Sequence, residues 1–385
     1  MNAISKVLAP SLIWPDEGQR WVAEPRRHAP GLDGLLAWST EWGASRISFH
    51  TGKPAWLRIH GRNHPVTQHA LDEADMAAIV NHLYGADGTA RLQGGQDFDV
   101  AYEIHVTRSK RLRFRLNATP TQTSRGGGAN VVLRPIPDLP PPLQDQLVEA
   151  MILDNCRPAS GMVIVSGSTG SGKSTLIGGI TVAKLMDPAG NYNVLEAAAP
   201  VEFLLDRLKG PSSTIDQCEI PRDLPTFEAF IRGTTRREPT DIIVGECRDT
   251  GTMSAALNAA MLGATLTTTI HADNVPLTIQ RIAALCGNEE RENLLSSAAQ
   301  SLRLIVNQRL AFSTDGKRTA LREILVFNEK LREKLMRSDA SEWPDITKQA
   351  VLEHGQSYEV AIQLALKDGR ITEAEATRQR IRITG

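Results

Sequence analysis

The sequence predicts an α/β protein with two domains, an α+β domain followed by a larger domain in which strands and helices alternate. Two observations support the division. The chain has 385 residues, which is enough for two separate cores, and a proline-rich segment at 135–144 is typical of a semi-rigid spacer. A third observation concerns the part after the spacer, where short apolar runs separated by helix-compatible segments predict a parallel sheet.

The first domain is predicted over residues 34–134. Residues 1–33 contain four prolines and no clear periodicity, so we expect a loosely ordered lead-in there. Apolar residues recur at helical spacing between Leu71 and Leu83, and Gly85 can end that helix. The remaining expected elements are a short helix at 35–42, a glycine-rich turn at 125–130, and strands at 46–50, 55–60, 98–106, 112–117 and 131–134.

The second domain is predicted over residues 145–385. Each of its expected strands is a short apolar run, at 162–165, 192–195, 242–244 and 265–270. A helical C-terminal tail is expected from about Tyr358. Thr372 and Glu375 have the spacing of a capping box and predict the start of the last helix.

One motif marks the centre of the second domain. Gly167, Gly172, Lys173 and Ser174 follow the strand at 162–165 with the spacing G-x-x-x-x-G-K-S. Glycines let backbone N–H groups point at phosphate oxygens, and the N-terminus of the following helix favours the same anion. The motif predicts a bound nucleoside triphosphate, with Lys173 on the β- and γ-phosphates and the Ser174 hydroxyl on Mg²⁺. The predicted binding residues of the loop are Ser168, Thr169, Gly170, Ser171, Gly172, Lys173, Ser174 and Thr175.

Polar residues that follow the other strands are candidates for the rest of the site, because ligands of an open α/β sheet lie beyond the carboxyl ends of its strands. Glu246 comes after the strand at 242–244. A carboxylate at the end of a buried strand is typical of a Walker B segment, in which it interacts with Mg²⁺ or with the attacking water. His271 follows 265–270 and is placed to donate a hydrogen bond to the γ-phosphate. Glu196 and Glu202 are the acids near the strand at 192–195. Either can orient a water molecule, and surface exposure is an equally good interpretation of each.

Phosphoryl transfer also needs cations that offset the charge developing on the γ-phosphate. Arg232 and Arg236 lie four residues apart on a predicted helix before Pro239, and so are expected to share a face. Arg113 and Arg115 alternate on a strand of the first domain and point to one side. All four are candidate arginine fingers, within the chain or across a subunit boundary. The alternative interpretation for each is a surface cation or a salt-bridge partner.

Composition argues against other classes of function. A net charge of −1 gives no support for direct binding to nucleic acid or to a membrane surface. The four cysteines are scattered and form no C-x-x-C pair, so neither a disulfide framework nor a zinc site is expected. No apolar run approaches the roughly 18 residues of a membrane span. We therefore expect a cytoplasmic chain that meets the inner membrane only through partners.

Four ordered motifs resemble those of the type II/IV secretion ATPase superfamily, which includes the PilT-like pilus-retraction motors. The segments 167–175, 199–203 (Ala-Pro-Val-Glu-Phe), 244–249 (Val-Gly-Glu-Cys-Arg-Asp) and 269–273 (Thr-Ile-His-Ala-Asp) are similar to its Walker A, Asp-box, Walker B and His-box motifs. The second of them is nearer to the DotB-type ATPases of type IVB secretion and the related transfer ATPases of I-type conjugative plasmids. The resemblance extends over about residues 32 to 385.

The resemblance implies a PAS-like N-terminal domain, a RecA-like ATPase domain, and a ring-shaped homohexamer whose neighbouring subunits share the ATP site. It also implies that Glu246 is the catalytic carboxylate and that Glu202 and His271 assist. Two positions depart from the family pattern, because its usual acid falls on Ala198 and its first His-box histidine on Ala264. Glu196 lies two residues before Ala198 and can substitute for that acid if the segment stays extended.

The leading hypothesis is therefore a Mg-ATPase motor of a type IVB secretion or conjugation apparatus, attached to inner-membrane components of that apparatus. Closure of the two domains about the spacer is the expected mechanical step. A pilus-retraction motor is the alternative within the same chemistry. A nucleotide-dependent scaffold that does not hydrolyse ATP is the alternative from another class, motivated by Ala198 and Ala264.

Overall fold

The structure, a computed structural model, describes residues 31–59, 62–107, 111–124, 126–287 and 291–384. Almost all of the predicted lead-in, residues 1–30, lies outside these described residues. The chain forms two compact units, Met1–Asp138 and Leu139–Gly385, each with its own sheet. In the described part of the chain, no helix has both the length and the apolar character needed to cross a membrane.

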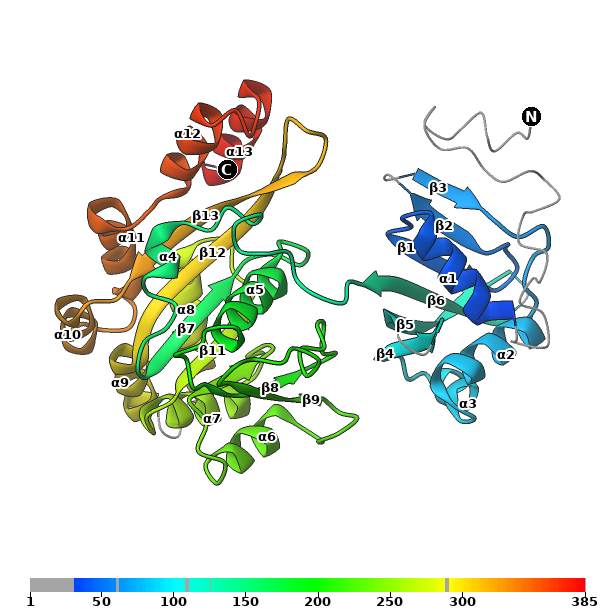
Figure 1. The fold of residues 1–385 in the computed structure, drawn as a ribbon, viewed down its shortest axis with the longest axis horizontal. Coiled ribbons are helices and arrows are strands. Elements are labelled where there is room, and N and C mark those ends of the chain that lie inside the picture. Colours follow the sequence, from blue (N-terminus) through cyan, green and yellow to red (C-terminus); the bar gives the residue numbers. More distant parts are fainter. Residues whose placement is uncertain (1–30, 60–61, 108–110, 125, 288–290, 385) are drawn as a thin grey trace. The chain divides into compact units, whose positions relative to one another are not determined.

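The first unit is a six-stranded antiparallel sheet with three helices (Figure 1). Its strand order is β3-β2-β1-β6-β5-β4. Alternate strand residues such as Ile47 and Phe49 are fully buried against apolar residues of α1 and α2, as expected for a sheet with one covered face. The elements are α1 Leu32–Glu41, β1 Arg46–His50, β2 Trp56–Ile59, β3 Arg62–Pro65, α2 Glu73–Tyr84, α3 Gly88–Gln93, β4 Phe98–His105, β5 Arg111–Thr123 and β6 Gly126–Ile136.

The glycine-rich segment of the first unit is strand rather than turn. Residues 126–130 were expected to turn the chain, but they form the start of β6 and pair with β5, so that prediction is wrong. Crowding explains one of the glycines, because a Cβ on Gly128 would lie 2.7 Å from the Thr123 side chain. Pro135 and Ile136, which were expected to begin the spacer, also belong to β6.

The second unit has a seven-stranded sheet in the order β13-β12-β7-β11-β10-β8-β9. All its neighbouring strands are parallel except the edge pair β12–β13. The strands are β7 Gly161–Ser166, β8 Asn193–Ala198, β9 Thr214–Glu219, β10 Asp241–Val244, β11 Thr265–Ile270, β12 Leu302–Phe312 and β13 Arg318–Val326. The helices are α4 Ala150–Leu153, α5 Lys173–Leu185, α6 Phe227–Thr234, α7 Thr250–Met261, α8 Val275–Leu285, α9 Arg291–Ser301, α10 Glu329–Arg337, α11 Trp343–His354, α12 Tyr358–Lys367 and α13 Glu373–Thr384.

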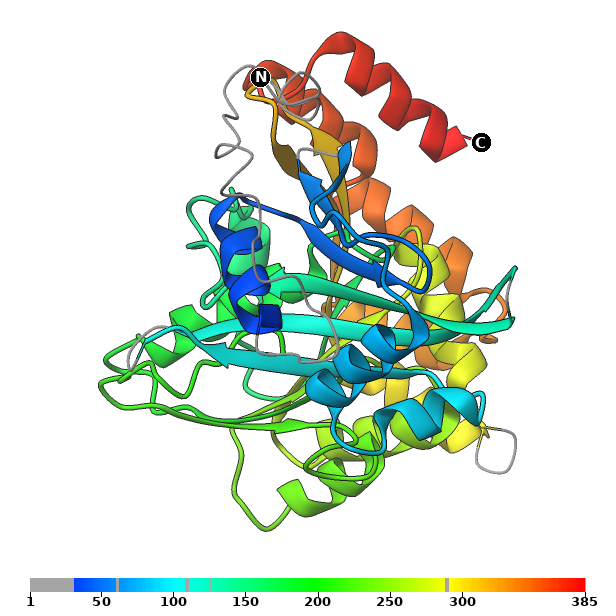
Figure 2. The same ribbon diagram turned by 90° about the vertical axis from the view of Figure 1, so that its right-hand side faces the viewer.

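Strand β7 lies inside the second unit with both faces covered. Met162 and Ile164 join one apolar cluster with α6 to α11, while Val163 and Val165 join another with α4 and α5. A strand buried on both faces has no polar side to alternate, which is why this segment reads as a continuous apolar run. The C-terminal helices α12 and α13 lie beside the β12–β13 hairpin (Figures 1 and 2).

The predicted strands of the second unit are confirmed, with shifts of up to three residues at their ends. Helix α12 begins at the predicted Tyr358. The Thr372 hydroxyl caps α13 by accepting a hydrogen bond from the Glu375 backbone N–H at 3.2 Å. The Glu375 carboxylate accepts from the backbone N–H of Phe312 instead, so α13 is tied to the β12–β13 hairpin.

Candidate functional site

The glycine loop connects the central strand β7 to helix α5. Gly167, Gly170 and Gly172 all have positive φ angles, of 145°, 77° and 85°. A Cβ on Gly167 would also lie only 2.4 Å from the carbonyl oxygen of Gln308. Glycine is therefore required by conformation and by space, and the loop directs the chain so that α5 begins at Lys173. The N-terminus of this 13-residue helix presents free backbone N–H groups to an anion.

Lys173 lies over this loop. Its Nζ donates hydrogen bonds to the carbonyl oxygens of Gly167 at 2.8 Å and Ser168 at 3.0 Å. Burial lowers the pKa of the Lys173 ammonium, and the negative charges of Glu246 and Glu202 raise that pKa. Both carboxylates are thus close enough to the lysine to act on it electrostatically.

Glu246 and His271 meet at the carboxyl ends of two neighbouring strands. β10 and β11 are parallel and in register, with Val244 opposite Thr268. The Nε2 atom of His271 lies 3.2 Å from a carboxylate oxygen of Glu246, whose other oxygen lies 2.7 Å from Arg248. Glu246 is 16% exposed and His271 43% exposed. The structure therefore brings together three of the predicted site residues, Lys173, Glu246 and His271.

The two remaining acids differ in their surroundings. Glu196 lies within β8, and its carboxylate accepts a hydrogen bond of 2.6 Å from Gln217 Nε2 on the adjacent strand β9. The segment is extended as far as Ala198, so Glu196 and Ala198 are on the same face of the strand. Glu202 follows the cis peptide bond between Ala199 and Pro200 and interacts electrostatically with Lys173.

The predicted arginine pair on α6 is not formed. Helix α6 ends at Thr234, so Arg232 and Arg236 do not share a helical face and that prediction is wrong. The hydroxyls of Thr234 and Thr235 donate to the carbonyls of Ile231 and Arg232, which a longer helix would have used itself. Arg232 pairs with Glu228 one turn earlier at 2.8 Å, a geometry typical of an exposed salt bridge.

Arg113 and Arg115 belong to β5 in the first unit. They face acids of the neighbouring strand β4, with Arg113 3.8 Å from Glu103 and Arg115 3.1 Å from Asp99. Arg113 is buried and Arg115 is about one-third exposed. Both side chains thus have acidic partners within their own unit. They lie on the same side of β5, as the alternating pattern predicted.

A pocket of about 520 Å³ adjoins the glycine loop. Its lining includes Gly172 and Thr175 at the loop, Gln308 and Arg318 of the β12–β13 hairpin, and Arg370 between α12 and α13. Gln308 also holds the loop directly, because its Nε2 donates to the carbonyl of Ser171 at 2.6 Å. Gln308 is not among the predicted site residues, since no local pattern shows that a strand about 140 residues later returns beside β7.

Cys247, between Glu246 and Arg248, is expected to resist alkylation in the folded protein. Burial raises the pKa of its thiol to about 11. Only the thiolate reacts, and at pH 8 about one in a thousand such thiols is ionised, against roughly one in four for a free cysteine. Iodoacetamide at pH 8, followed by peptide mass analysis, should label Cys247 at least about tenfold more slowly in native than in denatured protein. Equal rates in the two states would contradict this burial.

The geometry of the second unit defines a class of protein. A largely parallel sheet carries a glycine loop after a central strand, and a carboxylate–histidine pair at the ends of neighbouring strands. This is the arrangement of a RecA-like ATPase domain, here preceded by an N-terminal α+β domain, and it confirms the predicted fold class. The chain belongs to the family of type II/IV secretion system proteins, which matches residues 95–320, more than half of its length.

Individual relatives agree with this membership. The ATPase DotB of Legionella pneumophila has a similar structure, with a TM-score of 0.80 and 34% identity, covering 94% of this chain and 98% of DotB. DotB of Yersinia pseudotuberculosis gives a TM-score of 0.78 and 26% identity, covering 91% and 93%. The type IV pilus retraction ATPase PilT of Pseudomonas aeruginosa is 29% identical over 308 residues, which are 79% of this chain and 85% of PilT. The predicted relationship to this superfamily is confirmed.

Proposed function

We propose that this chain is a Mg²⁺-dependent ATPase that works as a homohexameric motor in a secretion or conjugation apparatus. The observation that carries the proposal is the convergence of Lys173, Glu246 and His271 beside the glycine loop. Lys173 and the loop N–H groups bind the phosphates, and Glu246 orients or deprotonates the attacking water. His271, within hydrogen-bond distance of Glu246, senses whether the γ-phosphate is present.

The residues present fit ATP and Mg²⁺. Three positive-φ glycines give the loop the turned backbone that a phosphate cradle needs, and Lys173 supplies the cation. Among the described residues no cluster of three or more acids, histidines or cysteines forms a ready metal site. A Mg²⁺ ion held by the Ser174 hydroxyl and by phosphate oxygens agrees with this donor set, and when bound it neutralises charge on those phosphates. We place the base and ribose in the pocket of about 520 Å³ next to Gly172 and Thr175.

The remaining predicted residues keep proposed roles. Glu202 assists at the metal-bound water, since it interacts electrostatically with Lys173. Glu196 is a weaker candidate because Gln217 engages its carboxylate. Arg113, Arg115, Arg232 and Arg236 remain candidates for contacts with nucleotide, within the chain or from a neighbouring subunit. The domain bounds proposed for this motor are those predicted from the sequence, 34–134 and 145–385, joined by the spacer 135–144, except that Pro135 and Ile136 end the first domain as part of β6.

The fine assignment to type IVB secretion or conjugation is supported by the two similar DotB structures. Pilus retraction is the second candidate, favoured by the sequence similarity to PilT. In either case, we propose that the protein lies in the cytoplasm and reaches the inner membrane through partner proteins. Deletion of the gene separates the two: loss of substrate export or of plasmid transfer supports the first, and loss of twitching with retained export supports the second.

The activity itself is tested on purified protein. Light scattering during size exclusion, with and without Mg-ATP, should give the mass of six chains, and the same peak should release phosphate at steady state. A peak that binds ATP without releasing phosphate would favour a non-hydrolysing scaffold. A peak that binds no nucleotide would overturn the proposal.

A further inference from the structure

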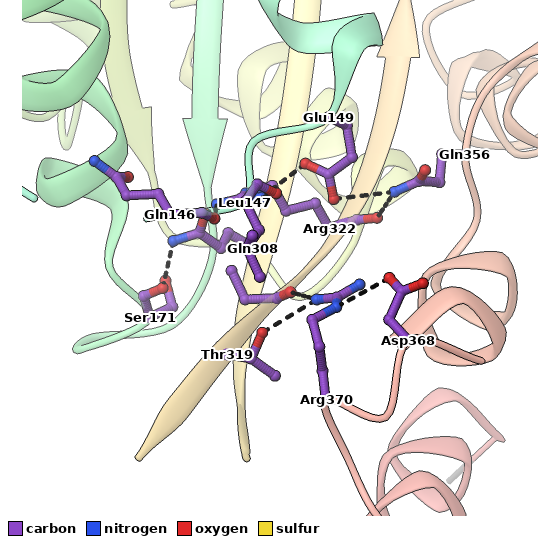
Figure 3. A network of polar contacts seen from close by, with 11 residues as sticks. Gln146, Leu147, Glu149, Ser171, Gln308, Thr319, Arg322, Gln356, Asp368 and Arg370 are labelled. Carbon is purple, nitrogen blue, oxygen red and sulfur yellow. Dashed lines mark hydrogen bonds and ion pairs between the residues drawn. The ribbon is translucent and has the colours of Figure 1, made fainter. Parts of the chain in front are cut away.

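A network of polar side chains lies behind the glycine loop, and three of its members, Gln146, Gln308 and Arg322, also line the pocket that adjoins the loop. Gln308 of β12 is its first member (Figure 3). Its side-chain Nε2 donates to the Ser171 carbonyl at 2.6 Å, and its backbone oxygen is the atom that a Cβ on Gly167 would strike. Gln308 is therefore in contact with both ends of the phosphate-binding turn.

Arg322 of β13 is the centre of this network. It lies opposite Gln308 in the antiparallel pair β12–β13, is 1% exposed, and donates from Nε to Gln308 Oε1 at 2.7 Å. Its other nitrogens donate to the carbonyls of Gln146 and Leu147, both at 3.1 Å, and to the Glu149 carboxylate at 2.7 Å (Figure 3). One guanidinium thus connects the support of the loop to residues 146–149.

A second, shorter connection reaches the same segment. Gln146 Nε2 donates to the Thr175 carbonyl in the first turn of α5 at 3.2 Å, and to the Pro141 carbonyl at 2.6 Å. Gln356 closes the other side of the network by donating to the Arg322 carbonyl at 2.9 Å. The segment 141–149, which includes the last four residues of the proline-rich spacer, is therefore attached to both ends of the phosphate-binding region.

A buried guanidinium is costly unless its donors are satisfied, and a well-packed apolar side chain would often stabilise a core equally well. Here four acceptors on two segments, one on β12 and three within 146–149, fill the planar fork of Arg322. Lysine cannot reproduce that fixed geometry, because its ammonium is a single point charge. The arrangement gives directional contact between segments, which simple burial does not require.

We propose that Arg322 is a positioning residue that couples the state of the phosphate-binding loop, through Gln308, to the segment 141–149. The proposal rests on the proposed function, since it requires the loop to bind nucleotide. When the loop closes on phosphate, the Ser171 carbonyl is fixed, Gln308 is fixed with it, and Arg322 holds the carbonyls of Gln146 and Leu147 in one position. Nucleotide binding is thereby transmitted to the part of the chain that leads to the first unit.

Hydrogen exchange of the full-length protein, with and without Mg-ADP, tests this coupling. In the wild type, ADP should slow exchange at residues 168–176 and also at 141–149. In Arg322→Met, ADP should still protect 168–176, with affinity reduced about tenfold for the lost charge-assisted hydrogen bond to Gln308. The protection at 141–149 should fall by at least half, because only the connection from Gln146 to Thr175 remains. Arg322→Lys should not restore it, because lysine cannot fill the same four acceptors.

Gln308→Met separates coupling from simple anchoring. It leaves the bonds from Arg322 to residues 146–149 in place, so basal exchange of 141–149 should stay as in the wild type while its response to ADP falls by at least half. The double variant should bind ADP no more weakly than Arg322→Met alone, since both changes cut one pathway. Gln308→Met also provides the test if Arg322→Met fails to fold.

The matched control is Lys184→Met. Lys184 forms a buried ion pair of 2.5 Å with Asp241 at the far end of α5, so its loss also breaks a buried charge pair. This variant should lose thermal stability and keep the ADP response at 141–149. An unchanged response in both Arg322→Met and Gln308→Met would overturn the coupling while leaving the ATPase proposal intact. If ADP does not slow exchange at 168–176 in the wild type, both the ATPase proposal and the coupling proposal are wrong.

Discussion

Glu246→Gln is expected to bind nucleotide about as tightly as the wild type and to release phosphate at least about 100-fold more slowly, as for the loss of a general base. Glutamine has the same shape and keeps an oxygen toward His271, so ground-state binding changes little. It cannot accept a proton from water, and it no longer places a negative charge near Lys173. Steady-state phosphate release and the binding of a fluorescent ATP analogue measure the two effects separately.

Glu196→Gln is the matched comparison for this prediction. It makes the same carboxylate-to-amide change in the same sheet, but at a side chain already engaged by Gln217. We expect its phosphate release to stay within a few-fold of wild type, as for a group outside the reacting geometry. If Glu196→Gln stops turnover and Glu246→Gln does not, the catalytic carboxylate is Glu196 and the strand-tip assignment is wrong.

The sequence predicts the centre of the second unit well because its signals are local. Strand β7 must be apolar on both faces, and the glycines must adopt positive φ within a few residues of it. Glu246 and His271 directly follow apolar runs, so the rule that ligands gather at the carboxyl ends of parallel strands is enough to bring them together. No knowledge of strand order is needed for that step.

Other features depend on pairing between distant segments, which local patterns do not reveal. In strand β9, buried and exposed residues alternate only weakly, so the strand is identified by its parallel pairing with β8. The glycines of β6 resemble a turn in the sequence, and only their pairing with β5 in the long hairpin shows that they belong to a strand. Arg322 and Glu149 are separated by 173 residues. Their contact follows from the β12–β13 register, and an arginine in an apolar strand would otherwise be assigned to the surface.

Lys173→Ala is expected to weaken nucleotide binding at least about 100-fold and so to abolish turnover at ordinary ATP concentrations. When phosphate is bound, the ammonium can replace its two bonds to the loop carbonyls by bonds to phosphate oxygens. Hydrogen bonds to a charged group contribute about 1.5–3 kcal/mol each, and two of them at the lower limit correspond to roughly 100-fold in affinity. Isothermal titration with Mg-ADP measures the loss.

The same variant should not unfold the protein, and this separates a binding role from a structural one. Burial lowers the pKa of the Lys173 ammonium, which means that the folded state holds this charge at a cost that the acids Glu246 and Glu202 offset only in part. Removing the charge relieves that cost but also removes the two bonds to the loop carbonyls, so the melting temperature of Lys173→Ala should stay near the wild-type value. A lower melting temperature together with unchanged ADP affinity would show that Lys173 supports the loop and does not bind phosphate.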